Sequence, residues 1–339
     1  MRQQENKMNK SKVMAIFVGS LLLLAICILA SLAFGARFIS FTDVMDTLWH
    51  AKKTTMDQLV VHERIPRTVF GLMAGAALGV SGALMQAITR NPIADPSILG
   101  VNTGASLFVV SGIAFFKIGS AHEYILFALM GATLTSVLVY GIGAMGSGGA
   151  TPIKLALAGA ATSAALSSVV SAILLPRTEV MNAFRFWQVG SISGATWEGI
   201  LSISPYLVIG LLLGIVVSPS LDALALGDDV ATGLGVRTGF TRLMGAFSGV
   251  LLCGATTALA GPIGFVGLMI PHVMRLIFGS SLRCIIPMSA VGGAILLTGS
   301  DVLGRVIGTP SELEAGIITA FIGAPVLIYI AMKAKVRAL

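Results

Sequence analysis

The chain has 339 residues, of which 55% are hydrophobic and only 11% are charged. Soluble globular domains carry roughly 25% charged residues, so this composition excludes a water-soluble protein and indicates an integral membrane protein of several helices. The net charge of +7 does not indicate nucleic-acid binding, because in a membrane protein the positions of the charges matter more than their sum.

Apolar runs of roughly 20 residues recur along the chain without strand-like alternation, which favours spanning helices over a β-barrel. The first run, Val13 to Phe34, follows a basic polar head and lacks a small-residue cleavage site, so we interpret it as a retained span rather than a signal peptide. The pattern predicts about ten spans. Their expected limits are 13–35, 66–88, 98–116, 122–144, 153–175, 199–218, 240–260, 262–279, 284–304 and 313–332.

The distribution of Lys and Arg predicts the orientation. An even number of spans places both termini on one side of the membrane, and that side carries the larger share of the basic residues. Basic residues are enriched on the cytoplasmic side, so both termini are expected in the cytoplasm of a multi-pass cell-membrane protein. The predicted organisation is a cytoplasmic tail over 1–12, a single transmembrane domain over 13–332 and a second cytoplasmic tail over 333–339.

The stretch from Arg64 to Gly104 opens with RIPR and then carries a small residue at every fourth position. Small residues allow close helix contacts in lipid. A four-residue step advances about 40° around a helix of 3.6 residues per turn, so the row winds around the helix and predicts contacts with several neighbours. The expected packing residues are Gly71, Gly75, Gly79, Ala83, Gly100 and Gly104. Pro66 is expected at the first helical position, with Arg64 and Arg67 at the outer start of the span.

Two outer segments have an amphipathic character. The segment 36–65 carries enough charge, together with Trp49, to predict a short interfacial helix. The segment 176–198 is amphipathic and includes Phe184, Trp187 and Trp197, which suit the headgroup level of a membrane.

The segment 219–239 is the only long loop on the predicted cytoplasmic side. Its apolar residues, Leu221, Leu224 and Leu226, predict a patch on one or two short helices lying at the membrane surface. Asp228 and Asp229 follow Gly227 and are expected to cap a helix that begins at Val230. Gly233 and Gly235 are expected to end that helix.

An internal repeat is also indicated. The exit of the second span, LGVSGALMQAITRNPIADPSILGV, and that of the seventh, LLCGATTALAGPIGFVGLMIP, both read as a small-rich helix, a proline turn and an apolar re-entry. Because these spans run in opposite directions, the pattern predicts a five-plus-five inverted repeat in an all-α polytopic membrane protein.

Few residues could carry chemistry. Asp301 and Arg305 are spaced as an i,i+4 pair, and His272 in PHVMR has no second ligand at metal spacing, so no metal site is expected. No carboxylate lies clearly at the centre of a span, which argues against an ion-coupled pump. The chain has no G-x-x-x-x-G-K-[ST] phosphate loop, so we expect no enzyme activity and no bound cofactor here, and any ATP must be used by another chain.

Five stretches occur in order at compatible spacing: RIPR, GAALGVSGALMQAITRNPIADPSILGVNTGA, LALGDDVATGLGVRT, GPIGFVGLMIPHVMRL and SDVLGR…GIITAFIGAPVLIYI. Together they resemble the FecCD/BtuC-type permeases, the membrane subunits of ABC importers for iron–siderophores, haem and cobalamin. The resemblance covers the chain from about Arg64 to Lys333. It implies a ten-span permease paired with a second permease subunit, two ABC ATPase subunits and an extracytoplasmic solute-binding protein.

The resemblance also implies roles for particular residues. Arg64, Arg67 and Arg305 match the outer arginines that meet acidic residues of the binding protein. The ATPase coupling segment maps to Leu221, Leu224, Leu226, Gly227, Asp228, Asp229, Gly233 and Gly235. The cytoplasmic gate maps to Thr151, Pro152 and Ile153.

Three classes of function stay open at this point. The first is the permease subunit of an ABC importer, with an iron–siderophore favoured as the cargo over haem or cobalamin because most relatives carry it. The second is a self-contained channel or ion-coupled secondary transporter. The third is a membrane scaffold that transports nothing.

Overall fold

The computed structural model describes residues 10–50, 55–146 and 150–333, so the predicted terminal tails lie largely outside the described residues. The described residues form helices and no strands. The helices are α1 (Lys10–Ala33), α2 (Phe41–His50), α3 (Met56–Thr89), η1 (Pro96–Leu99), α4 (Val101–Ser111), η2 (Gly112–Phe116), α5 (Ala121–Ala144), α6 (Pro152–Leu174), α7 (Thr178–Gln188), α8 (Trp197–Leu224), α9 (Asp228–Gly233), α10 (Thr238–Ala260), α11 (Val266–Phe278), α12 (Leu282–Ile307) and α13 (Ala315–Lys333).

The predicted all-α membrane fold is confirmed. Within the described residues, seven helices are long and apolar enough to cross a membrane. Shorter apolar helices occupy Val101–Phe116, Val266–Phe278 and Ala315–Tyr329. Each of the predicted apolar runs thus coincides with an apolar helix, whereas the exact number of spans and the inverted repeat stay predictions.

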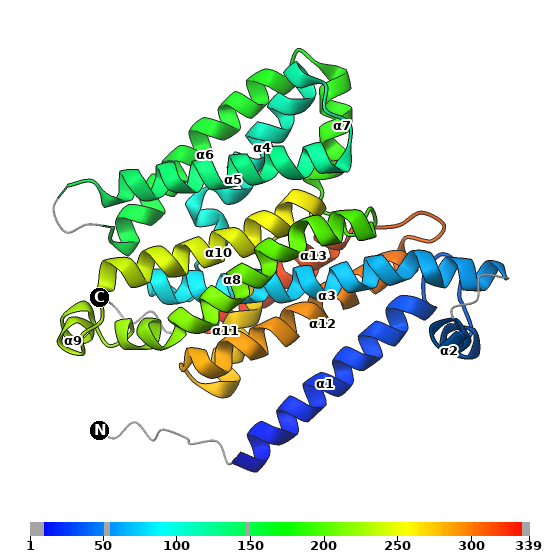
Figure 1. Ribbon diagram of the computed structural model, residues 1–339, viewed down its shortest axis with the longest axis horizontal. Coiled ribbons are helices and arrows are strands. Elements are labelled where there is room, and N and C mark those ends of the chain that lie inside the picture. Colours follow the sequence, from blue (N-terminus) through cyan, green and yellow to red (C-terminus); the bar gives the residue numbers. More distant parts are fainter. Residues whose placement is uncertain (1–9, 51–54, 147–149, 334–339) are drawn as a thin grey trace.

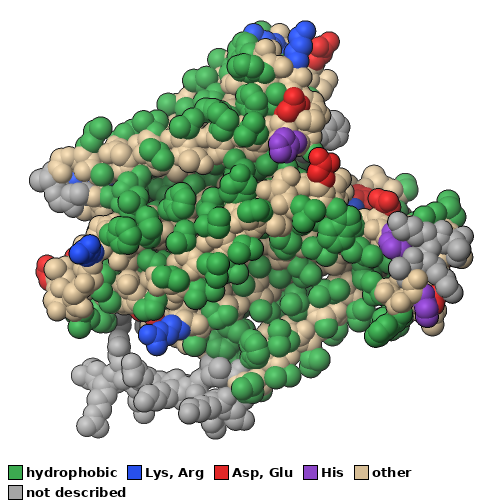
Figure 2. Space-filling model, in the orientation of Figure 1, with side chains coloured by type: hydrophobic (Ala, Val, Ile, Leu, Met, Phe, Trp, Pro, Cys, Tyr) green, Lys and Arg blue, Asp and Glu red, His purple; other side chains and the backbone are tan. Residues whose placement is uncertain are grey.

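The long helices run roughly side by side, with α9 at one end of the bundle and α2 and α7 at the other (Figure 1). We call these the α9 end and the α2 end. Hydrophobic side chains cover the face shown in Figure 2, and the charged side chains visible there gather towards the two ends. This pattern is the one expected where the middle of the bundle faces lipid and its ends face water.

Helix α3 begins earlier than the sequence predicts. The Thr55 hydroxyl caps the first turn by accepting from the Gln58 backbone amide. The Gln58 side-chain oxygen in turn accepts from the Thr55 backbone amide, and the two bonds form a capping box. The expectation that Pro66 stands at the first helical position is therefore wrong, since Pro66 lies inside the helix. At 1.5 Å per residue the 34 residues of α3 extend about 51 Å, longer than the roughly 30 Å hydrocarbon core.

The glycines of α3 place it in direct backbone contact with its neighbours. A Cβ atom at Gly75 or Gly79 would overlap the backbone of α12 at Gly293 or Ser289, and one at Gly82 would overlap Gly267 of α11. Successive glycines of the row thus meet different partners, and α3 occupies the centre of the bundle, in contact with α8, α10, α11 and α12.

Hydrogen bonds add to this central packing. Ser81 of α3 donates to the Gly249 carbonyl of α10 at 2.6 Å, and Gln86 donates to the Leu268 carbonyl of α11 at 3.0 Å. Both polar side chains are fully buried, so these bonds satisfy donors that lipid could not.

A second close crossing joins α4 and α5. Gly104 and Gly131 face each other so closely that a Cβ atom on either would overlap the backbone of the other. Gly100 has φ +72°, a left-handed conformation that ends η1 and starts α4.

Helices α2 and α7 lie within the two outer segments 36–65 and 176–198, and their place at a membrane interface stays a prediction. The indole of Trp49 on α2 is 78% exposed at the α2 end. On α7 the aromatic face turns inward instead, because Phe184 is buried and packs against Trp187 at a ring separation of 5.7 Å.

Replacing Gly79 with Ala is expected to destabilise the protein by about 1–3 kcal/mol, because the added methyl group meets the Ser289 carbonyl across a packed interface. Gly141→Ala in α5 is the matched control, since a Cβ atom there has nothing within 4 Å. That change is expected to stabilise its helix by up to about 1 kcal/mol through helix propensity. Unfolding midpoints in detergent would measure both changes, and equal shifts for the two variants would contradict the packing role of Gly79.

Candidate functional site

The α2 end holds a network of buried charges that joins α3 and α12. The Arg67 guanidinium contacts Asp301 at 2.7 Å and Glu312 at 2.7 Å. Asp301 also pairs with Arg305 at 3.0 Å, the i,i+4 contact that the sequence predicts. The side chains of Asp301 and Arg305 are only 1% exposed. One buried carboxylate therefore compensates two guanidinium groups.

Arg64 and Arg305 also bind the end of α1. Arg64 donates to the carbonyls of Leu32 and Ala33 at 2.9 and 3.0 Å. Arg305 donates to the carbonyls of Ser31 and Phe34 at 3.0 and 2.9 Å. These carbonyls belong to the last turn of α1 and its exit, where intrahelical partners run out and cations are favourable. The two arginines thus hold α1 against the bundle.

A hollow of about 660 Å³ lies at this end and is lined by all three predicted docking arginines. Its wall also includes Arg37, Glu63, Glu312 and the segment 193–196. Arg64 and Arg305 are buried and engage internal acceptors, whereas the Arg37 side chain is 59% exposed and, among the described residues, pairs with Asp57 at 2.7 Å. The accessible positive charge of the hollow is therefore concentrated at Arg37.

At the opposite end, the coupling segment differs in part from the expectation. Helix α8 continues through Pro219 to Leu224 and buries Leu221 and Leu224 completely, so the prediction that these residues form an exposed patch is wrong. Pro219 cannot donate to the Ile215 carbonyl. The Ser218 hydroxyl donates to that carbonyl instead, at 2.8 Å, which allows the helix to continue.

Helix α9 runs over Asp228–Gly233, two residues earlier than the predicted start at Val230, and Gly227 rather than an aspartate is its N-cap. Gly235 has φ +82° and follows its end, as the sequence predicts. Leu226, Val230 and Leu234 are 66%, 50% and 64% exposed. Val230 and Leu234 lie four residues apart along α9, and Leu226 lies just before its start. We call these three exposed apolar residues the α9 stripe.

Asp228 is the charged residue that ties α9 to the bundle. Arg242 of α10 donates to both of its carboxylate oxygens at 2.8 Å, and Arg90, directly after α3, also pairs with it. Partial burial acts to raise the pKa of Asp228, but the hydrogen bonds and charges of Arg242 and Arg90 outweigh it and lower the pKa below its ordinary value. The carboxylate is therefore ionised at neutral pH.

The predicted gate residues lie at the start of α6. Thr151 caps this helix by accepting from the Lys154 amide, and Pro152 occupies its first turn. Ile153 is 74% exposed. The three residues thus form a fixed helix start at the α9 end with one apolar side chain projecting from it.

The sequence reasoning missed a polar cluster between α4 and α10. The Thr257 hydroxyl donates to Asn102 at 3.1 Å, and the Cys253 thiol lies 3.8 Å from the same amide oxygen. Asp95, in the turn before η1, accepts from the Ser97 amide at 2.9 Å, and burial raises the pKa of its carboxyl. Asn102 inside an apolar run was the signal available in the sequence.

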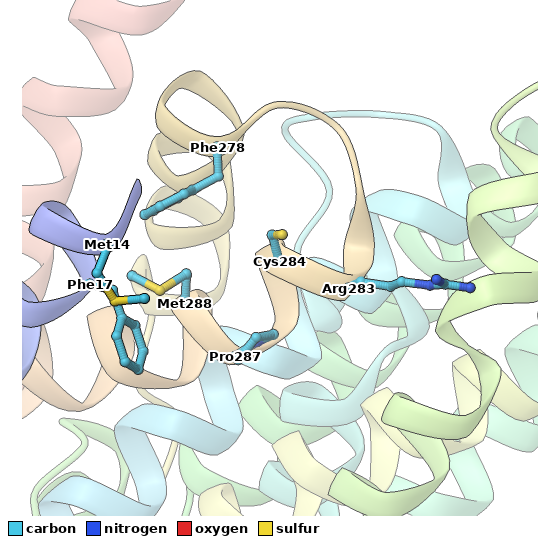
Figure 3. Close-up of a pocket in the computed structure, with 7 residues that line it drawn as sticks. All are labelled: Met14, Phe17, Phe278, Arg283, Cys284, Pro287 and Met288. Atoms are coloured by element: carbon cyan, nitrogen blue, oxygen red, sulfur yellow. The ribbon is translucent and has the colours of Figure 1, made fainter. Parts of the chain in front are cut away.

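A second hollow, of about 430 Å³, lies between the start of α1 and the adjoining ends of α11 and α12 (Figure 3). Phe17, Phe278 and Met288 gather around it, whereas the Arg283 side chain points away. Apart from Arg283 and Cys284 its wall is apolar, which does not suit the binding of a polar chelate. Among the described residues, no three His, Cys, Asp or Glu side chains are grouped so as to hold a metal ion.

Removing the carboxylate of Asp301 is expected to cost about 3–5 kcal/mol of stability, because it leaves two buried guanidinium groups without their shared counter-charge. Glu312→Gln is the control, since that side chain is 36% exposed and its pair with Arg67 is expected to contribute at most about 1 kcal/mol. Unfolding of Asp301→Ala and Glu312→Gln in mixed detergent micelles would compare them. Similar losses of stability in the two variants would show that the buried network does not depend on Asp301.

Comparison with known proteins places this arrangement in context. Residues 23–333 match the FecCD transport family. The Fe(3+)-citrate import system permease protein YfmD of Bacillus subtilis is 41% identical, over 97% of this chain and 98% of its own length. The ferric enterobactin transport system permease protein FepD of Escherichia coli is 41% identical, over 93% and 94%. A solved metal-chelate type ABC transporter in an inward-facing conformation superimposes with a TM-score of 0.82 at 27% identity, over 94% of this chain and 99% of that chain.

Proposed function

Because this chain belongs to the FecCD transport family of ABC transporter permease subunits, we propose that it forms the translocation pathway for an iron–siderophore chelate. Membership of the family implies partnership with an ATPase and a binding protein. The stoichiometry that we propose is two permease chains, identical or homologous, two ATPase subunits and one extracytoplasmic binding protein.

The cargo is inferred from the relatives. Those named above serve ferric citrate and ferric enterobactin, and a further relative, 38% identical, is the iron(3+)-hydroxamate import permease FhuB of Bacillus subtilis. These chelates differ in chemistry but share ferric iron, so ferric chelates as a class have more support than haem or cobalamin. Growth of a deletion strain on single ferric siderophores would identify the cargo. A deletion strain that uses ferric siderophores normally, but fails to grow when haem is the sole iron source or when cobalamin is required, would contradict the proposal.

The observation that carries the assignment of the ends is the α9 stripe. Leu226, Val230 and Leu234 leave an apolar surface exposed at one end of the bundle, beside the ion pairs of Asp228. The chain has no phosphate loop, so energy from ATP must reach it through contact with another protein. We place the ATPase contact at this stripe, the α9 end in the cytoplasm and the α2 end outside the cell.

The second permease chain is proposed to face α6. Its residues Ala160, Ala164, Ser167, Ser168 and Ser171 are exposed and lie on one side of the helix, which also carries the exposed Leu157. A side that is mostly Ala and Ser suits a protein interface or an aqueous pathway better than lipid contact. Thr151–Ile153 at the start of the same helix is then well placed to act as the gate.

Replacing Leu226, Val230 and Leu234 together with Ser is expected to weaken ATPase association on the order of 100-fold or more, because burying each such side chain contributes about 1.5–3 kcal/mol. Leu276→Ser on α11 is the control, since it removes a leucine that is 71% exposed outside the stripe. Co-purification of the ATPase with each variant would measure the effect. Undiminished association of the triple variant would overturn the assignment of α9.

The binding protein is proposed to dock at the α2 end over the hollow lined by Arg37, Arg64, Arg67 and Arg305. Arg37→Glu is expected to weaken docking on the order of tenfold at low salt, since it reverses the most exposed charge of the rim. Its ion pair with Asp57 is exposed, so folding should persist. Arg185→Glu on α7 is a charge-matched control. Equal binding-protein affinity for both variants would exclude this rim.

The competing class of function is an ion-coupled transporter or channel. The purified chain alone in liposomes should take up no ferric chelate under a proton or sodium gradient. Uptake under those conditions would contradict the ATP-driven mechanism, whereas uptake that appears only with the ATPase, the binding protein and ATP supports it.

A further inference from the structure

Helix α9 has few attachments to the rest of the chain. Among its six described residues, Ala231 is the buried one, while Asp229, Val230 and Gly233 are exposed. The backbone joins it to α8 through Gly227, which has φ +116°. Besides the packing of Ala231 and the chain links to α8 and α10, the carboxylate of Asp228 attaches α9 to the bundle through its ion pairs.

This carboxylate connects α9 with two other helices. Arg242 is buried within α10 and reaches both oxygens of Asp228 with one nitrogen, Nη2, at 2.8 Å. Its Nε atom is buried without a hydrogen-bond partner. Arg90 reaches the same Oδ1 atom, and its Nη2 also donates to the Leu224 carbonyl at the end of α8, at 2.5 Å. Asp228 thus holds the ends of α3, α8 and α10 together with α9.

Arg90 is positioned to respond to any displacement of this joint. It ends α3 in a left-handed conformation, φ 49°, which few non-glycine residues adopt. On one side of it lies α3, the central helix of the bundle. On the other side the turn 91–95 leads to η1, where the Ile98 carbonyl is packed so closely on Gly159 of α6 that a Cβ atom at Gly159 would overlap it. A shift of Arg90 therefore reaches both α3 and α6.

We propose that Asp228 is the positioning residue that converts movement of α9 into movement of α3 and of the turn 91–95. The inference rests on the proposed function, since the movement of α9 is supplied by the ATPase bound at the α9 stripe. Asp228 acts through Arg90 and Arg242 and touches no cargo. A neutral side chain at this position keeps the shape of the joint but loses the charge that holds both arginines.

Asp228 could also stabilise α9 without transmitting any movement, and the two roles need different variants. An acidic residue in the first turn of a helix stabilises that helix through its dipole, and Asp229 shares this position without pairing to either arginine. Asp229→Asn removes a charge from the same turn and leaves both ion pairs intact. If Asp229→Asn has an effect, it should lower the amount of ATPase bound and leave the nucleotide-dependent change in α3 intact.

The test compares hydrogen–deuterium exchange in the reconstituted complex of permease and ATPase, with and without ATP and vanadate. In the wild-type complex, nucleotide trapping should change exchange in the peptides covering 84–95. Compared at equal amounts of bound ATPase, Asp228→Asn should lose the nucleotide-dependent change in exchange. Asp228→Glu should restore at least about half of it, because the carboxylate can still reach the arginines.

Three results would overturn the proposal. One is a nucleotide-dependent change in Asp228→Asn equal to that of the wild type. Another is increased exchange of α9 and 84–95 in Asp228→Asn already without nucleotide, with the response intact, which would show a structural pair only. The third is a wild-type complex whose 84–95 peptides do not respond to nucleotide. The triple variant of Leu226, Val230 and Leu234 tests the proposed function separately. If the ATPase does not bind at the α9 stripe, that variant will still bind it.

Discussion

The close contact between the backbones of α3 and α12 is the constraint on which the rest of the structure depends. Gly75 and Gly79 meet Gly293 and Ser289 with no room for a side chain, so the separation of the two helices is set by backbone atoms alone. Without a hydrophobic force between helices in lipid, such contacts and buried hydrogen bonds supply the association. The same contact fixes where both ends of α3 lie. It brings Arg67 to Asp301 at one end and carries Arg90 to Asp228 at the other.

The two ends differ in how their charges are held. At the α2 end, Asp301 and Arg305 are almost fully buried, and the guanidinium groups also bind the carbonyls that end α1. Separating such charges leaves them unpaired in a low-dielectric interior, which is costly, so this end resists rearrangement. At the α9 end, Asp228 is 46% exposed, and water can solvate its carboxylate if the pairs open. Ion pairs of this kind contribute little to stability, and they can be exchanged during a conformational change.

The sequence predicted the helices well because hydropathy is a property of each segment by itself. The glycine row of α3 was also readable locally. The role of Arg64 was not, because it depends on α3 beginning at Met56 and passing beside the end of α1, which are three-dimensional facts. Leu221 and Leu224 were mistaken for surface residues because Pro219 looks like a helix end. The Ser218 hydroxyl, which takes over the missing backbone bond, overrides that signal. The docking, coupling and gate roles stay predictions, since they concern partners rather than this chain alone.

The burial pattern of the arginines bears on how a permease can recognise a partner outside the cell. Arg64 and Arg305 are buried and donate to internal carbonyls, yet their charge still contributes to the potential in the hollow above them. Arg64 and Arg305 can therefore serve both purposes, holding α1 through hydrogen bonds and attracting an acidic surface through their field. In the docking that we propose, Arg37, with its side chain largely in solvent, supplies the direct contact. This division explains how arginines matched to a docking role can be buried here, and it separates the long-range attraction of the partner from the short-range pairing that orients it.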